Sequence, residues 1–226
     1  YKSSYYNEYM ICMRKYQMLK MQQEMNIEHE FYLVHDTKDT VSILSMIKDN
    51  VIRLGKDVSV EHRKRTGDVP HNYIYANLYF PDLHNLSHLF DVSIILHPKV
   101  LIEYGGIFNR GWLGVSKDSI HFNKSDTLDI FNKKMNDARE FIKNPITLPE
   151  IVRKNPGMFH HEIMFDKEIS LKDNLIGIVC NHCPDKVIRK IKAELNKHSF
   201  PDIMIITRNY PFPSLNDLLD YHSQSH

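Results

Sequence analysis

The stretch EFYLVHDTKDTVSILSMIKDNVI, residues 30–52, contains the first two elements of the expected fold. Its first half is rich in aromatic and branched apolar residues, which predicts a strand from Glu30 to Thr37. Asp39 or Thr40 then provides an N-cap for a helix. The apolar residues of that helix recur on one face: Ile43, Leu44, Ile47 and Val51. A strand followed by a capped helix predicts a domain that mixes the two types of element.

The same reading along the chain predicts further strands and helices. Strands are expected at residues 73–80, 92–96, 162–165, 174–180 and 202–208, and helices at 127–144 and 184–199. The segment 174–207 reads as a βαβ-like unit whose apolar strands are buried on both faces. We therefore expect an α+β fold, with a mostly antiparallel β core and flanking helices.

The chain is expected to contain an N-terminal appendage and one domain. Residues 8–25 lack Gly and Pro and carry a methionine-rich stripe at helical spacing. The predicted organisation is an N-terminal Met-rich helix in residues 1–28 and a single α+β domain in residues 29–226. The methionine stripe either packs on that domain or binds a partner protein, because methionine faces adapt to varied surfaces.

Composition limits the classes of function. A net charge of +1 over 226 residues does not indicate a particular class of binding partner. No apolar run reaches membrane-spanning length. With 8 glycines, the chain contains no glycine-rich phosphate-binding motif. Three cysteines are too few for a disulfide framework, so we expect a reducing compartment, the cytoplasm of a cell or host, or a virion. Abundant Asn, Ile, Lys, Tyr and Met fit an AT-rich genome, and a parasite, a bacterium or a large DNA virus would each be a suitable source.

The segment CNHCP, residues 180–184, brings Cys180, His182 and Cys183 together. A closed zinc site needs four ligands and no second cluster follows, so no metal site is predicted. The C-x-x-C spacing also resembles a redox motif. Because the pair ends an apolar strand, ordinary packing of the thiols is the favoured interpretation.

The segment GMFHHEIMF, residues 157–165, places Glu162 at the start of an apolar strand. Glutamate is depleted in strands and costly to bury without a partner. Glu162 therefore either faces solvent or lines a cleft in which its carboxylate has a function.

Three pieces occur in a fixed order: VHDT with His35 and Thr37, the aromatic strand YIYANLYF at residues 73–80, and HEIMF with Glu162. In this order the chain resembles the ADP-ribosyltransferase superfamily over residues 30–212. The resemblance is to the branch of bacterial toxins that modify thymidine in single-stranded DNA.

The resemblance implies that NAD is the substrate and that Glu162 is the catalytic carboxylate. Cleavage of the nicotinamide–ribose bond passes through an oxocarbenium-like state, which a nearby carboxylate stabilises. His35 is expected to bind the adenosine-side ribose, and Thr37 to support the same loop. A tyrosine is expected to stack on nicotinamide, with three candidates: Tyr73, Tyr75 and Tyr79.

Two functions remain open. Asp36 stands where the family has Gly, and no Arg follows the aromatic strand closely. The chain is either an enzyme that transfers ADP-ribose to a nucleic-acid or protein acceptor, or a non-catalytic structural or interaction subunit of a larger assembly, for which a virus is one candidate source. For the enzyme, the basic segment EHRKRTG, residues 61–67, is the expected acceptor contact. An enzyme should gather His35, a tyrosine and Glu162 around one pocket.

Overall fold

The computed structural model describes eight ranges of the chain: residues 27–37, 39–61, 72–83, 92–109, 119–143, 162–181, 183–200 and 203–208. The predicted Met-rich helix at residues 8–25 and most of the basic segment 61–67 lie outside these ranges. Within the described ranges, no helix is both long enough and apolar enough to cross a membrane.

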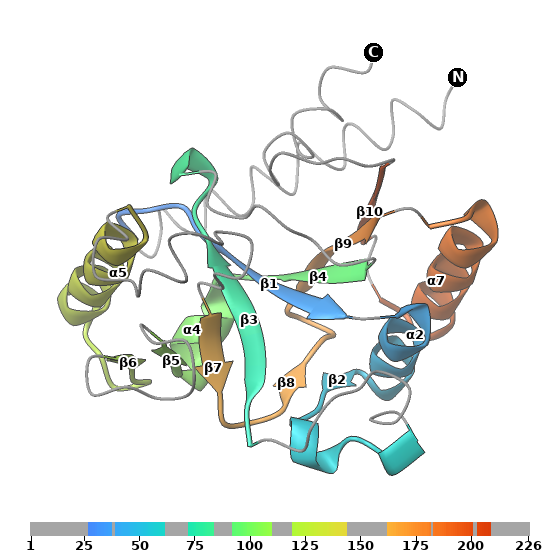
Figure 1. The fold of residues 1–226 in the computed structure, drawn as a ribbon, viewed down its shortest axis with the longest axis horizontal. Coiled ribbons are helices and arrows are strands. Elements are labelled where there is room, and N and C mark those ends of the chain that lie inside the picture. Colours follow the sequence, from blue (N-terminus) through green and yellow to red (C-terminus); the bar gives the residue numbers. More distant parts are fainter. Residues whose placement is uncertain are drawn as a thin grey trace, which may run out of the picture.

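One large sheet organises the molecule (Figure 1). Its strand order is β10-β9-β4-β1-β3-β7-β5-β6. The bounds are β1 Tyr32–Thr37, β3 Ile74–Tyr79, β4 Val92–Leu96, β5 Gly106–Phe108, β6 Ile120–Phe122, β7 Glu162–Phe165, β9 Leu175–Asn181 and β10 Met204–Arg208. Every neighbouring pair is antiparallel except β9 and β10, which are parallel. The expected α+β class with a mostly antiparallel sheet is confirmed.

The parallel pair is the βαβ-like unit predicted from the sequence. Helix α7, Asp185–Lys197, connects β9 to β10 and covers one face of them through Ile191 and Leu195. A parallel pair requires such a crossover, because a tight turn reverses the chain direction.

Helix α2, Thr40–Asp49, begins as predicted and ends earlier. The Asp39 side chain accepts a hydrogen bond from the backbone N–H of Ser42 at 2.7 Å. Asn50 adopts a left-handed backbone conformation with φ 56° and ends the helix. Asparagine tolerates this conformation better than most residues do. The predicted extension to Val51 is therefore wrong, since Val51 opens strand β2, Val51–Ile52, which pairs with β8, Ile169–Ser170.

The main core lies on one face of the sheet. Apolar residues of α2, α7, α4 (Lys99–Tyr104) and α5 (Leu128–Lys143) form one cluster with Leu33, Leu78 and Ile94 of the sheet. Helices α2 and α7 pack together near β9 and β10, while α5 lies beside β6 at the other end (Figure 1). Two short 3-10 helices, Gly55–Asp57 and Pro81–Leu83, complete the described elements.

Strands β1 and β3 pair over only part of their length. Their ladder joins three residue pairs, from Tyr32 with Tyr79 to Val34 with Asn77. On its other side, β1 pairs with β4 as far as Thr37. The second half of β1 therefore follows β4 and leaves β3, so the centre of the sheet contains a divergence between two neighbouring strands.

Candidate functional site

Strand alternation sorts the central side chains onto two faces, because successive residues of a strand point in opposite directions. Leu33, His35 and Thr37 share one side of β1, and Leu33 belongs to the main core. Asp36 lies on the other side. The neighbouring strands contribute residues to that second face, which include Tyr75, Asn77, Ser93 and Glu162.

The second face carries a set of polar side chains that we call the polar row: Ser93 of β4, Asp36 of β1, Asn77 and Tyr75 of β3, and Glu162 of β7. Its apolar neighbours Val34, Tyr79, Ile95 and Met164 are buried, yet none of them belongs to the main core cluster of the described residues. The row therefore crosses four adjacent strands on the face opposite the described helices.

Asp36 is the centre of the row. One carboxylate oxygen accepts a hydrogen bond from the hydroxyl of Ser93 at 2.5 Å, and the other accepts from the amide of Asn77 at 2.8 Å. Ser93 and Asn77 are buried, whereas Asp36 is partly exposed. Two buried donors thus fix a carboxylate that remains accessible, at the point where β1 leaves β3.

His35 joins the two diverging strands from the other side of β1. Its Nδ1 lies 2.7 Å from the carbonyl oxygen of Tyr75, so this nitrogen carries the proton and donates. The predicted neighbourhood of the three strands is confirmed, since β1, β3 and β7 are adjacent. The structure does not, however, bring the His35 side chain to the face that holds Glu162, because His35 and Asp36 are successive residues of one strand.

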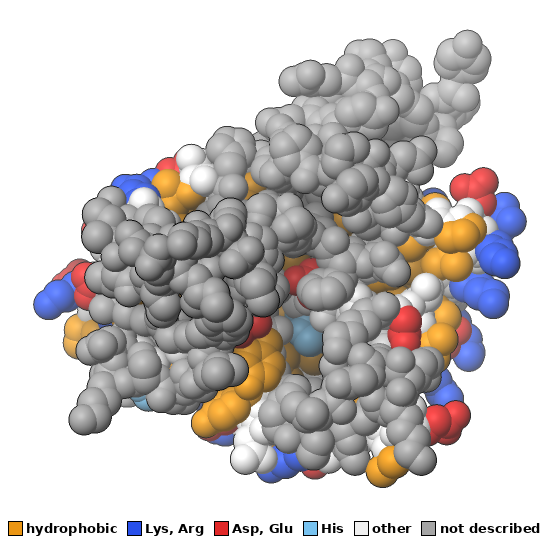
Figure 2. Space-filling model, viewed as in Figure 1, with side chains coloured by type: hydrophobic (Ala, Val, Ile, Leu, Met, Phe, Trp, Pro, Cys, Tyr) orange, Lys and Arg blue, Asp and Glu red, His pale blue; other side chains and the backbone are white. Residues whose placement is uncertain are grey.

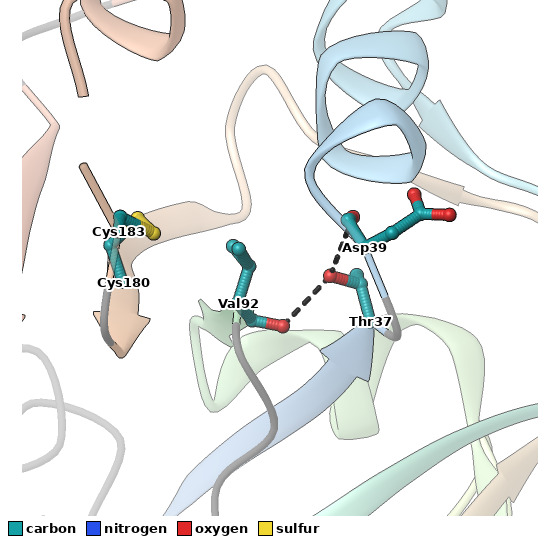
Figure 3. Close-up of a disulfide and its surroundings, with 5 residues drawn as sticks. All are labelled: Thr37, Asp39, Val92, Cys180 and Cys183. Carbon is teal, nitrogen blue, oxygen red and sulfur yellow. Dashed lines mark hydrogen bonds between the residues drawn. A yellow bond between two sulfur atoms is a disulfide. The ribbon is translucent and has the colours of Figure 1, made fainter. Parts of the chain in front are cut away.

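Thr37 has a structural hydrogen bond. Its hydroxyl donates to the carbonyl oxygen of Val92 at 2.8 Å and lies 3.4 Å from that of Asp39 (Figure 3). Because the side chain is buried, it connects β1 to β4 and to the start of α2. Thr37 therefore anchors the end of β1 and does not belong to the polar row.

The three candidate tyrosines differ in accessibility. Tyr79 is fully buried against Tyr32, with ring centroids 6.5 Å apart, so its ring is not available to a ligand. Tyr73 and Tyr75 are partly exposed and meet edge to face, with centroids 6.4 Å apart. Only these two rings offer a surface on which a planar ligand could stack.

Glu162 is the second carboxylate of the row. It lies directly opposite Asn77 in the β3–β7 ladder and is partly buried. Burial raises its pKa above the usual range. Burial also raises the pKa of Tyr75, and the negative charge of Glu162 raises it further. Among the described residues no side chain donates a hydrogen bond to the Glu162 carboxylate, although desolvation without a partner is costly.

The row offers two carboxylates in different environments. Asp36 accepts hydrogen bonds from two side chains, whereas Glu162 is desolvated, and desolvation raises its pKa. Asn77 lies between the two carboxylates, bonded to Asp36 and opposite Glu162 in the ladder. Carboxyl groups with a raised pKa are typical of sites of acid–base and glycosidic chemistry.

Sequence reasoning found Glu162 and Tyr75 and missed Asp36, Asn77 and Ser93 as site residues. Asn77 and Ser93 each stand out as a polar residue within a largely apolar strand, whereas Asp36 lies between two other polar residues in β1. The family resemblance marks Asp36 only as a departure from its motif. Its partners could not be assigned, because the pairing of β1 with both β3 and β4 is not encoded locally.

Cys180 and Cys183 are joined by a disulfide, with their Cα atoms 5.5 Å apart. The prediction that both thiols simply pack is therefore wrong. His182 lies outside the described residues. Within the described ranges, no group of three or more metal-ligating side chains converges.

A basic surface lies on α7. Lys186, Arg189, Lys190 and Lys192 are exposed on this helix. Figure 2 shows Lys and Arg side chains gathered along the edge of the molecule over α7. Such a surface attracts polyanions, although a solvated helix face often carries charges of this kind.

A family model described as "Family of unknown function (DUF5846)" matches residues 28–145. The chain is 40% identical over 230 residues to the uncharacterized protein R11 of Acanthamoeba polyphaga mimivirus, an alignment that covers 96% of this chain and 85% of that protein. No solved structure matches the chain. The family match contains Asp36, Asn77 and Ser93, whereas Glu162 lies beyond its end and within the longer alignment.

Proposed function

This chain belongs to the family of unknown function DUF5846, and we propose that it is an ADP-ribosyltransferase-like protein that binds NAD across the polar row. The observation that carries the proposal is Glu162, a desolvated carboxylate without a described partner that lies beside Tyr75 and opposite Asn77. Perturbed carboxylates of this kind concentrate at functional sites.

The proposed roles follow from the chemistry of each side chain. Asp36, held by Ser93 and Asn77, accepts hydrogen bonds from ribose hydroxyls. Tyr73 or Tyr75 stacks on the nicotinamide ring. Glu162 stabilises positive charge that develops on the ribose as the bond to nicotinamide breaks.

The transfer balances without another reactant. Nicotinamide leaves as a neutral molecule with the electron pair of its bond to C1′. An acceptor oxygen or nitrogen forms the new bond to C1′, and its proton passes to the Glu162 carboxylate, whose raised pKa makes it a stronger base than an ordinary glutamate.

The adjacency of β1, β3 and β7 supports the proposal, because the family resemblance implies an NAD cleft lined by residues of an early, a middle and a late strand. In this proposal His35 has a different role from the one expected of the family. It holds β1 to β3 through the Tyr75 carbonyl and acts as a positioning residue rather than as a ribose ligand.

The similarity to a mimivirus protein supports an origin in a large DNA virus, with activity in the host cytoplasm or the virion. The acceptor in this proposal is a nucleic acid or a protein. The exposed cations of α7 offer a described contact for phosphates, in addition to the basic segment 61–67.

The test is incubation of the protein with NAD labelled in the adenylate phosphate, together with a nucleic-acid and protein extract. We expect label in a macromolecular fraction with the wild type and at least about a hundredfold less with Glu162→Gln. The matched control is Glu168→Gln, which changes an exposed glutamate near the same strand. Binding of NAD without transfer would indicate a binding module. Neither binding nor transfer would favour the non-catalytic assembly subunit.

A further inference from the structure

The disulfide between Cys180 and Cys183 lies where β9 passes into α7 (Figure 3). Cys180 is fully buried within the sheet, opposite Val92 of β4. Cys183 is partly exposed and directly precedes Pro184, the N-cap residue of α7. The two sulfurs of one bond therefore differ in their access to solvent.

The disulfide is expected to contribute little to the stability of the folded chain. The cysteines are separated by three positions, and a ring of so few residues removes little conformational entropy from the unfolded chain. The arrangement is instead one in which thiol chemistry is favoured. A cysteine at the start of a helix is the member of a C-x-x-C pair whose thiolate form the helix N-terminus stabilises.

We propose that Cys180 and Cys183 form a redox-active pair that undergoes reversible exchange with a small monothiol, with Cys183 as the sulfur that is attacked. The inference is independent of NAD binding. Burial closes the path to Cys180, so an external thiolate meets Cys183 first.

Reduction proceeds in two steps that conserve electrons. A thiolate RS⁻ attacks Sγ of Cys183, the protein S–S bond breaks, and its electron pair goes to Sγ of Cys180, which takes a proton from water. A second RS⁻ attacks the R sulfur of the mixed disulfide and releases Cys183 as a thiolate with RSSR. Two monothiols are oxidised to one disulfide while the protein gains two thiols.

The bridge has a defined structural neighbourhood. Val92 lies opposite Cys180 in the β4–β9 ladder. The carbonyl oxygen of Val92 accepts a hydrogen bond from the hydroxyl of Thr37, the residue after Asp36. Opening the bridge removes the covalent link between β9 and the residue that precedes the N-cap of α7.

The test uses the full chain with Cys12→Ser, so that the pair contains all remaining thiols. The protein is equilibrated in buffers with different ratios of reduced to oxidised glutathione, quenched in acid, alkylated and weighed by mass spectrometry. We expect a reversible transition in which two alkylation sites appear together. Reduced protein that never re-forms the bridge, or a bridge that yields only in denaturant, would overturn the proposal.

Single variants test the direction of attack. In the folded protein, Cys180→Ser should form a glutathione adduct at Cys183 at least about tenfold faster than Cys183→Ser forms one at Cys180. Circular dichroism confirms that each variant is folded. Equal adduct rates in folded variants would contradict the assignment of Cys183, and zinc retained stoichiometrically by the reduced protein would show that the pair is a metal site.

Discussion

Glu162 combines a cost in stability with a proposed catalytic role. Its pKa is raised by burial, so the folded chain holds a proton at pH values at which the unfolded chain has lost it. By linkage, the stability contributed by this group falls as the pH rises through and above the usual glutamate range. At neutral pH the ionised side chain is therefore destabilising.

Glu162→Gln should raise the free energy of unfolding at pH 7 by about 0.5–2 kcal/mol, because it removes a desolvated charge and keeps the shape. Urea denaturation at pH 7 and pH 4 measures the effect. The gain should shrink at pH 4, where Glu162 is increasingly protonated. A destabilised Glu162→Gln at pH 7 would show that the carboxylate has a favourable partner.

His97 should contribute to the acid sensitivity of the fold. Burial and, to a smaller extent, the charge of Lys99 lower its pKa from 6.5 to about 4. Between these values the unfolded chain binds a proton that the folded chain does not bind. The stability contributed by neutral His97 is complete above pH 6.5 and is lost as the pH falls toward 4.

His97→Asn should therefore flatten the loss of melting temperature between pH 6.5 and pH 4.5. The asparagine oxygen can replace Nδ1 of His97, which accepts the backbone N–H of Lys99 at 3.0 Å. Differential scanning calorimetry at several pH values checks this. Parallel pH profiles for the wild type and the variant would contradict the assignment.

At the residue scale, the sequence singles out a side chain only where the local pattern carries the signal. Glu162 is anomalous within its own strand, and Tyr75 lies in an aromatic one, so both were identified. The predicted grouping of the His35 and Glu162 side chains is not observed. The face of the sheet on which a side chain lies depends on the strand register, which the local sequence does not reveal. Register placed Asp36 on the Glu162 face and its neighbour His35 on the other.

At the scale of elements, the Asp36 hydrogen bonds hold strands together where the backbone ladder stops. The β1–β3 ladder ends at Val34 and Asn77, and the Asn77 side chain then reaches Asp36. On the other flank, Ser93 binds the same carboxylate from β4. Side chains thus supply the connection that main-chain hydrogen bonds no longer provide.

Asp36→Ala should lower the free energy of unfolding by about 1–3 kcal/mol, since it leaves the buried donors of Ser93 and Asn77 without this acceptor. Asp36→Asn is the matched control. It should lose less stability, because the amide oxygen can still accept a hydrogen bond from one of the two donors. Urea denaturation midpoints provide the measurement. An unchanged midpoint for Asp36→Ala would show that water replaces the carboxylate at no cost.

Most element types were predictable, and some boundaries were not. The strands at 92–96 and 162–165 were predicted at their observed limits, because apolar runs and flanking polar residues define both. The end of α2 was missed, since Val51 continues the helical spacing and only the left-handed conformation of Asn50 ends the helix. Helix propensity alone does not reveal that conformation.

At the scale of the whole molecule, the sheet order could not be read from the sequence. Strand β7 pairs with β3 although more than eighty residues separate them, and β9 lies beside β4. Such pairings depend on the packing of every element at once. The polar row exists only because this order aligns residues from four strands.

The central claim is that the polar row binds NAD, and isothermal titration calorimetry tests it most directly. We predict that the wild type and the Glu168→Gln control bind NAD with the same affinity. Tyr75→Ala and Asp36→Asn should each weaken binding by about tenfold or more, the equivalent of one lost stacking contact or hydrogen bond. No detectable binding by the wild type, or one affinity shared by all four proteins, would contradict the claim.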